Sequence, residues 1–143
     1  MSGLYLHIPF CRKRCTYCDF HFSTTFENYR SSLISALVRE LVLRASPSVG
    51  VIQTIYFGGG TPSILTPLEL SLIFETIRQH YLVAPDAEIS FEANPEDISV
   101  ENLTTWKSVG INRLSIGLQT FSDADLQWMN RAHLVSDGLE GIK

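Results

Sequence analysis

The sequence lacks several features that would each assign it to a particular class of protein. Lysine and arginine number 11 against 15 aspartates and glutamates, and the net charge of −4 provides no basic surface for a nucleic acid. No apolar run approaches the ~18 residues that span a bilayer. The N-terminal stretch MSGLYLHIPF also lacks the basic segment, long apolar stretch and cleavage site of a secretory signal. We therefore expect neither nucleic acid as a partner nor a transmembrane segment.

Cysteine is scarce, and its placement is informative. The chain has three cysteines, Cys11, Cys15 and Cys18, all in the stretch HIPFCRKRCTYCDF with the spacing C-x3-C-x2-C. An odd number of clustered cysteines without a secretory signal argues against a disulfide scaffold, which pairs its cysteines in an oxidising compartment. We therefore expect reduced thiols and a cytoplasmic location.

The hydrophobic pattern predicts an α/β fold. With 143 residues, 45% of them hydrophobic, the chain has the size and composition of one ordinary domain. Strand-like apolar segments alternate with segments whose apolar residues recur every three or four positions, as in a helix. The predicted strands cover 4–10, 53–60, 87–95 and 112–119. Helices are predicted over 27–44, 122–129 and 136–143, and two more are predicted to begin at Thr66 and Ser99.

This alternation predicts a parallel sheet. The connections between the predicted strands are long enough for right-handed parallel crossovers. In such a sheet the loops at the carboxyl ends of the strands carry the chemistry. The last predicted strand would leave a bare edge, and the helix predicted at 136–143 has no end signal. We therefore expect the chain to be the N-terminal part of a longer protein.

Three clustered thiolates are typical ligands of zinc or of an iron–sulfur cluster. A structural zinc ion would need a further ligand from His7, Asp19 or His21, and the spacing C-x3-C-x2-C-x2-H is unusual for zinc. A four-iron cluster held by three cysteines leaves one iron open to a small molecule. The spacing favours the cluster, with a zinc-stabilised binding module and uncoordinated or redox thiols as alternatives. Residues 12–14, all basic, would offset negative charge there or are simply solvated.

The cysteine motif, with Tyr17 just before its last cysteine, resembles the signature of the radical S-adenosylmethionine (SAM) enzymes. The blocks YLHIPFC, FGGGTPS, SFEANPE, NRLSIGLQTF and NRAH are similar, in order and spacing, to the oxygen-independent coproporphyrinogen III oxidase family. This resemblance covers essentially the whole chain. It implies the N-terminal part of a parallel, partial (β/α)6 barrel. Residues 1–143 would be a truncated core domain of about four βα units, without the C-terminal strands and C-terminal domain.

The resemblance also implies roles for particular residues. The three cysteines would bind a [4Fe-4S] cluster whose open iron is chelated by SAM, and the catalytic residues stay unknown. The implied SAM contacts are Tyr5, Tyr17, Gly59, Gly60, Thr61, Glu92, Gln119 and Arg131. Each of these roles has an alternative when the residues are considered alone. Tyr5 could equally be an aromatic residue of the core, Glu92 could be a solvated charge at a strand end, and Arg131 could be a surface cation. FGGGTP is not a phosphate loop, because it lacks the G-x4-G-K-[ST] pattern.

The chemistry implied by the resemblance is the one-electron cleavage of SAM to methionine and a 5′-deoxyadenosyl radical, which abstracts hydrogen from a substrate. The cofactors supply that chemistry and the protein supplies orientation. Its partners would be SAM, haem or a porphyrinogen, an electron donor and a haem-acceptor protein.

One departure from the oxidase pattern indicates the branch of the family. The oxidases resemble C-x3-C-x2-C-x-C, whereas Phe20 occupies the position of their additional cysteine. The CDF form and the short segment before LYLHIPF look like the haem-chaperone (HemW-like) branch, with the oxidase as the alternative. Whether the protein is an enzyme therefore stays open. The haem-binding residues of that branch would lie beyond Lys143 in the full-length protein.

Overall fold

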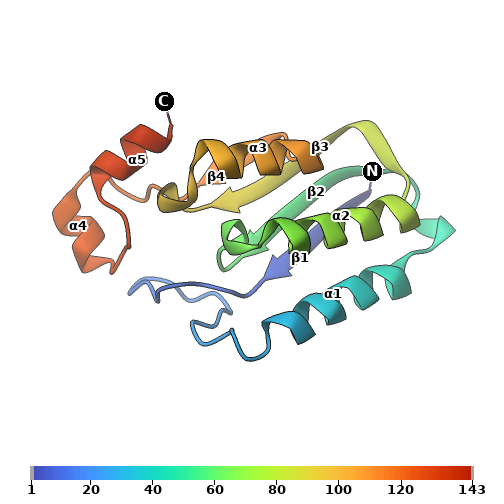
Figure 1. Cartoon of the computed structure of the whole chain (residues 1–143), viewed down its shortest axis with the longest axis horizontal. Coiled ribbons are helices and arrows are strands. Elements are labelled where there is room, and N and C mark those ends of the chain that lie inside the picture. The colour runs from blue at the N-terminus through green and yellow to red at the C-terminus, as the bar shows by residue number, and fades with distance from the viewer. Residues whose placement is uncertain (1, 143) are drawn as a thin grey trace.

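The computed structural model describes residues 2–142, and its centre is one parallel β-sheet (Figure 1). The sheet has four strands in the order β1-β2-β3-β4, and each neighbouring pair is parallel. The strands are β1 (Ser2–Ile8), β2 (Ile52–Gly59), β3 (Val83–Ala93) and β4 (Arg113–Ile116). Because all four run the same way, the loops that follow them gather at one edge of the sheet.

Each strand is followed by a helical segment, so the predicted βα alternation is confirmed. Three helices lie along one face of the sheet, and two short ones lie beyond the carboxyl ends of the strands (Figure 1). The first set is α1 (Arg30–Arg44), α2 (Pro67–His80) and α3 (Val100–Val109), and the second is α4 (Asp123–Trp128) and α5 (Val135–Gly141). Short 3-10 turns at Pro47–Val49, Pro62–Ile64 and Pro95–Asp97 complete the connections.

Several predicted boundaries are displaced. The first strand ends at Ile8, just before Pro9, and the first long helix begins at Arg30 rather than at 27. The third strand begins at Val83, earlier than predicted, because Val83 pairs with Ile52 of β2 across a shift in register. The last helix begins at Val135, and the final residue of the predicted helix 136–143 lies outside the described residues.

The two faces of the sheet differ in chemistry. Phe57 and Phe91 are fully buried under the helices, where their rings pack against Phe74 at 5.3 Å and Trp106 at 5.1 Å respectively. Strand side chains alternate between faces, so the neighbours of these residues point the opposite way. Tyr5 on that second face is 61% exposed. The apolar face therefore carries the core, and the polar face is open to a ligand.

An ion pair fastens the start of α1 to the start of α2. The Arg30 guanidinium donates two hydrogen bonds to Glu69, both at 2.6 Å, and one to Ile64 O at 2.7 Å. The Glu69 carboxylate also accepts from the backbone N–H of Thr66 at 2.7 Å and so completes the capping box of α2. Burial by itself would raise the pKa of Glu69, but the hydrogen bonds from Arg30 and Thr66 bring it below its ordinary value.

This pair makes stability depend on pH. Replacing Glu69 with Gln leaves Arg30 without its charged partner, and we expect the free energy of unfolding at pH 7 to fall by about 3 kcal/mol. Because the folded-state pKa of Glu69 is lowered, its contribution is present above the unfolded pKa of about 4.3 and is lost as the pH falls through the folded value. Urea unfolding followed by circular dichroism at several pH values measures both effects.

The control is Glu40→Gln, which removes an exposed ion pair with Arg44 (2.6 Å) within α1. That change should cost less than about 1 kcal/mol. A destabilisation by Glu69→Gln that stays the same from pH 7 to pH 3 would contradict the assignment.

Candidate functional site

The three cysteines lie in the loop that leaves the carboxyl end of β1. All three thiols are free and partly exposed. Two backbone hydrogen bonds close the base of this loop: Cys11 N donates to Ser23 O at 3.0 Å, and Ser23 N donates to Pro9 O at 2.8 Å. Phe10 and Ser23 form an isolated parallel bridge between them. These contacts keep the cysteines at the edge of the sheet where all the strands end.

A cavity of about 280 Å³ opens at this edge. Every residue that the sequence analysis assigned to the site, except Tyr5, lines it. Those residues are Cys11, Cys15, Tyr17, Cys18, Gly59, Gly60, Thr61, Glu92, Gln119 and Arg131. They come from the ends of all the strands and from the loop after α4. The structure thus brings together in one place side chains that lie far apart in the sequence.

Tyr5 lies beside the cavity rather than in its wall. It stands on the polar face of β1, where its ring stacks on Tyr56 with 6.1 Å between centroids. Its hydroxyl lies 3.0 Å from His7 Nδ1, and His7 Nε2 lies 3.0 Å from the carbonyl oxygen of His21. Tyr5 is therefore not the core aromatic that the residues alone allowed, and both ring nitrogens of His7 already have partners.

The glycine turn after β2 lies directly against the cysteine loop. Gly60 N donates to Ile8 O at 2.8 Å. A Cβ atom at Gly60 would lie 2.6 Å from Phe10 O and 3.0 Å from Cys11 Sγ, so no larger residue fits. The Thr61 hydroxyl is 3.5 Å from the same sulfur. Glycine is needed here because two backbones and a thiol meet without room for a side chain.

Glu92 is held in one orientation at the end of β3. Its carboxylate accepts a hydrogen bond from the Tyr56 hydroxyl at 2.7 Å and another from Gly59 N at 3.2 Å. The bond to Glu92, followed by burial, raises the pKa of Tyr56 above its ordinary value. A carboxylate has about four acceptor positions, so two of them remain for a ligand. Glu92 is therefore an ordered acceptor in the cavity wall rather than a solvated loop charge.

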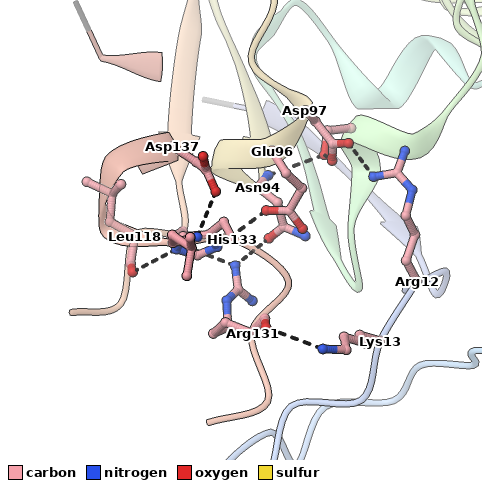
Figure 2. A network of polar contacts seen from close by, with 12 residues as sticks. Arg12, Lys13, Asn94, Glu96, Asp97, Leu118, Arg131, His133 and Asp137 are labelled. Atoms are coloured by element: carbon pink, nitrogen blue, oxygen red, sulfur yellow. Dashed lines mark hydrogen bonds and ion pairs between the residues drawn. The ribbon is translucent and has the colours of Figure 1, made fainter. Parts of the chain in front are cut away.

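Arg131 places a positive charge next to the cysteines. Its guanidinium reaches Cys15 Sγ at 3.4 Å and Gly117 O at 3.0 Å. It also donates to Asn94 Oδ1 at 2.8 Å (Figure 2). Its Nε is buried without a hydrogen-bond partner among the described residues. Arg131 thus joins the cysteine loop to the ends of β3 and β4, and the reading of this residue as a surface cation is wrong.

The backbone is strained at two points of the cavity wall. Within residues 2–142, the non-glycine residues with a positive φ are Gln119 (67°) and Asn130 (57°), and both line the cavity. Asn130 also donates from its side-chain amide to Arg14 O at 2.7 Å, while Thr16 N donates to Met129 O at 3.1 Å. Left-handed backbone costs about 1–3 kcal/mol outside glycine and concentrates at functional sites.

His133 ties the segment after α4 to the turn after β3. The residue is buried, and its Nε2 lies 3.3 Å from Leu118 O (Figure 2). Its Nδ1 lies 3.3 Å from a carboxylate oxygen of Glu96, which is within ion-pair distance but outside hydrogen-bond geometry. These contacts hold the loop that carries Arg131 close to the turn Pro95–Asp97.

Some wall residues were not found from the sequence. They are Ala93, Asn94, Glu96, Ser115, Gly117, Asn130 and Ala132, whereas the wall residues Arg12, Lys13 and Phe20 had been singled out in the cysteine motif without being assigned as ligand contacts. Several of them lie within the motif blocks that carried the resemblance. The blocks therefore indicated which segments form the cavity wall, but not which of their other residues line it. Asn130 has one local cue, because asparagine adopts left-handed backbone more readily than most residues.

The donor set fits an iron–sulfur cluster. Burial raises the pKa of Cys11, the Thr61 hydrogen bond opposes this rise, and the neighbouring Cys18 and Cys15 add to it. A metal and the adjacent Arg131 cation would favour the thiolates. In residues 2–142 no group of three His, Cys, Asp or Glu side chains is arranged around a single ion. A cluster does not require that arrangement, because each thiolate binds its own iron.

The comparisons with known proteins show the family of the chain. The sequence model of the Radical SAM superfamily matches residues 5–143. A mouse protein named radical S-adenosyl methionine domain-containing protein 1, mitochondrial, is 38% identical over 143 residues, which is 99% of this chain and 32% of that protein. The heme chaperone HemW of Mycobacterium tuberculosis is 40% identical over 135 residues, which is 92% of this chain and 35% of that protein.

Solved structures resemble the fold as well. Coproporphyrinogen III oxidase (HemN) from Escherichia coli superposes with a TM-score of 0.84 at 32% identity, over 97% of this chain and 34% of that one. The cobalamin-dependent SAM radical enzyme OxsB has a TM-score of 0.63 at 16% identity, which shows the fold alone. The chain thus spans about a third of the length of HemW and HemN. None of the helices within residues 2–142 has the length and hydropathy needed to cross a membrane.

The contact at Gly60 can be tested against a glycine elsewhere. Gly60→Ala should displace the backbone of Phe10 and the thiol of Cys11, and we expect iron retained after anaerobic reconstitution to fall by at least half. The control is Gly50→Ala, where φ is +70° but nothing lies within 4 Å, so it adds backbone strain away from the site. Equal iron retention by the two variants at equal thermal stability would show that the close approach is unimportant.

Proposed function

The chain belongs to the radical SAM superfamily, and from this premise we propose that Cys11, Cys15 and Cys18 hold a [4Fe-4S] cluster with SAM beside it. Domains of this family generally carry both groups. When bound, they supply one-electron cleavage of SAM and hence a carbon radical. The observation that supports this proposal most is that one cavity is lined by the three thiols together with an ordered carboxylate, a glycine turn and a cation.

The wall residues suit the two charged ends of the amino-acid part of SAM. We assign the α-ammonium to the backbone of Gly59, Gly60 and Thr61, because carbonyl groups reach a ligand closely where no Cβ intervenes. The carboxylate is assigned to Arg131, which offers a planar set of donors. Glu92 accepts from ribose hydroxyls or the ammonium, and Gln119 contacts the same ligand. Tyr17 in the wall and Tyr5 beside it pack near the ligand.

The full-length protein is proposed to act as a haem chaperone of the HemW type. Supporting this, HemW from M. tuberculosis is 40% identical and HemW from E. coli is 34% identical over the matched region. Phe20 lines the cavity and occupies the position where the oxidase pattern has a further cysteine. Its hydrocarbon side chain can neither bind a metal nor donate a hydrogen bond. Haem and a haem-acceptor protein would be its partners, with an electron donor for the cluster.

The alternative is an oxygen-independent coproporphyrinogen III oxidase, an oxidoreductase that decarboxylates its porphyrinogen substrate. The observation that favours it is the superposition on E. coli HemN, with a TM-score of 0.84. In either case we propose that the chain is the N-terminal part of the core domain, because its four βα units correspond to about a third of HemN.

The three free thiols suit a reducing compartment. We propose the cytoplasm. The mouse relative is named as mitochondrial, and a mitochondrial location is therefore the alternative.

Cluster and SAM binding can be separated with two variants of the full-length protein. Anaerobic reconstitution should give brown absorption and, after reduction, an electron paramagnetic resonance signal that changes when SAM is added. Cys15→Ala should lose the cluster. Glu92→Gln should keep the iron and the absorption but weaken the change caused by SAM. A colourless protein that retains one zinc ion per chain would refute the cluster and support the zinc-stabilised module.

The haem-chaperone and oxidase hypotheses predict opposite results with the reconstituted full-length protein. A chaperone should develop a Soret band when haem is added and should leave coproporphyrinogen III unchanged in the presence of SAM and reductant. Formation of protoporphyrinogen IX, measured by chromatography after oxidation, would establish the oxidase and overturn the chaperone proposal.

A further inference from the structure

Asp97 is a buried carboxylate that the proposed SAM and cluster contacts do not use. It ends the turn Pro95–Asp97 that follows β3, and the residue is only 5% exposed. Burying a carboxylate is costly unless it is paired and hydrogen-bonded. Asp97 meets this condition, because it forms an ion pair with Arg12 (Figure 2). It also accepts a hydrogen bond from the Ser63 hydroxyl at 2.5 Å.

The partners of Asp97 belong to different loops of the site. Arg12 directly follows Cys11 in the cysteine loop, and Ser63 lies in the 3-10 turn that follows the glycine turn. The Ser63 hydroxyl in addition accepts from Asn94 N at 3.3 Å. A single carboxylate therefore connects the loops after β1, β2 and β3, each of which contributes residues to the cavity wall.

The Asp97 side is itself anchored to the helical layer. Its backbone carbonyl accepts a hydrogen bond from the Asn102 side chain in α3 at 2.8 Å. Arg12, by contrast, keeps 54% of its side chain exposed, and no other side-chain partner holds it among the described residues. The pair therefore joins the buried turn Pro95–Asp97 to the more exposed cysteine loop. We expect its loss to loosen the segment around Arg12 and Cys11 while leaving the sheet intact.

We propose that Asp97 is a positioning residue: through Arg12 and Ser63 it sets where Cys11 and the glycine turn lie relative to the cavity, and it neutralises the cation beside Cys11. The expected effect of Asp97 on the potential of a cluster rests on the function proposed above. Its expected effect on the accessibility of the Cys11 thiol does not. The two are therefore measured separately.

Electrostatics give the pair a signature that simple unfolding would not produce. Reduction adds an electron to a cluster, so nearby positive charge favours the reduced form and nearby negative charge opposes it. Asp97→Asn leaves the Arg12 cation unpaired and should raise the midpoint potential. Arg12→Gln leaves the carboxylate unpaired and should lower it. The double variant is neutral at both positions and should return close to the original value.

The experiment uses the full-length protein with four variants: Asp97→Asn, Arg12→Gln, the double variant, and Ser63→Ala, which removes one hydrogen bond without changing the charge. Glu40→Gln in the exposed pair of α1 is the control. In the metal-free protein, the alkylation rate of Cys11 relative to Cys18 is followed by mass spectrometry. We expect it to rise about tenfold in Asp97→Asn and Arg12→Gln, because an anchoring bond to a charged group is lost, and to stay unchanged in the control.

Midpoint potentials are then measured by redox titration of the reconstituted proteins. Shifts of opposite sign in the two single variants, with recovery in the double variant, would support the proposal. Shifts of the same sign, or unchanged potentials together with unchanged alkylation rates, would overturn it. If Asp97→Asn fails to fold, Arg12→Gln decides by itself, since it must both speed alkylation and lower the potential. If the unsubstituted protein takes up no cluster, the proposed function fails while the alkylation rates still test Asp97.

Discussion

The parallel pairing of β1 with β2 brings the two loops of the site into contact. The register ends with Ile8 opposite Gly59, and the next residue, Gly60, donates its N–H back to Ile8 O at 2.8 Å. That bond places the glycine turn against Cys11, where a Cβ atom would already be in close contact with the sulfur. Because neighbouring parallel strands end at the same edge, β3 and β4 then add their own terminal residues to the same cavity.

Charged side chains then hold the loops in place. Arg131 connects Cys15 to the ends of β3 and β4, and Asp97 connects the loop of Cys11 to the glycine turn. Both groups are paired across loops rather than within one. Such ordering favours binding of a ligand in the cavity, because hydrogen-bond donors and thiols that already lie in position lose less conformational freedom on binding. The polar network and the cavity therefore form one unit.

The sequence predicted the fold, and most of the residues it singled out gather at one cavity, but some details needed the structure. The helix predicted to begin at Thr66 formed as expected, because its capping box with Glu69 acts within one turn of helix. The strand predicted over 112–119 is only Arg113–Ile116, since the chain turns after β4 and Gln119 adopts a positive φ. The polar wall around Asn94 and Asn130 was not found, because neither residue shows its partner in its local sequence.

By itself, the sequence determined the chemistry that is available: three thiols in one short loop, glycines after a strand, an acid at the end of the next strand, and Phe20 in place of a further cysteine. These are local properties, because they depend only on residue types and on their spacing along the chain. Only the tertiary structure decided which groups meet. Arg12 pairs with a residue 85 positions away, and Arg131 reaches a thiol 116 positions away. Such contacts follow from the order and register of the strands, which bring distant loops together at one edge of the sheet.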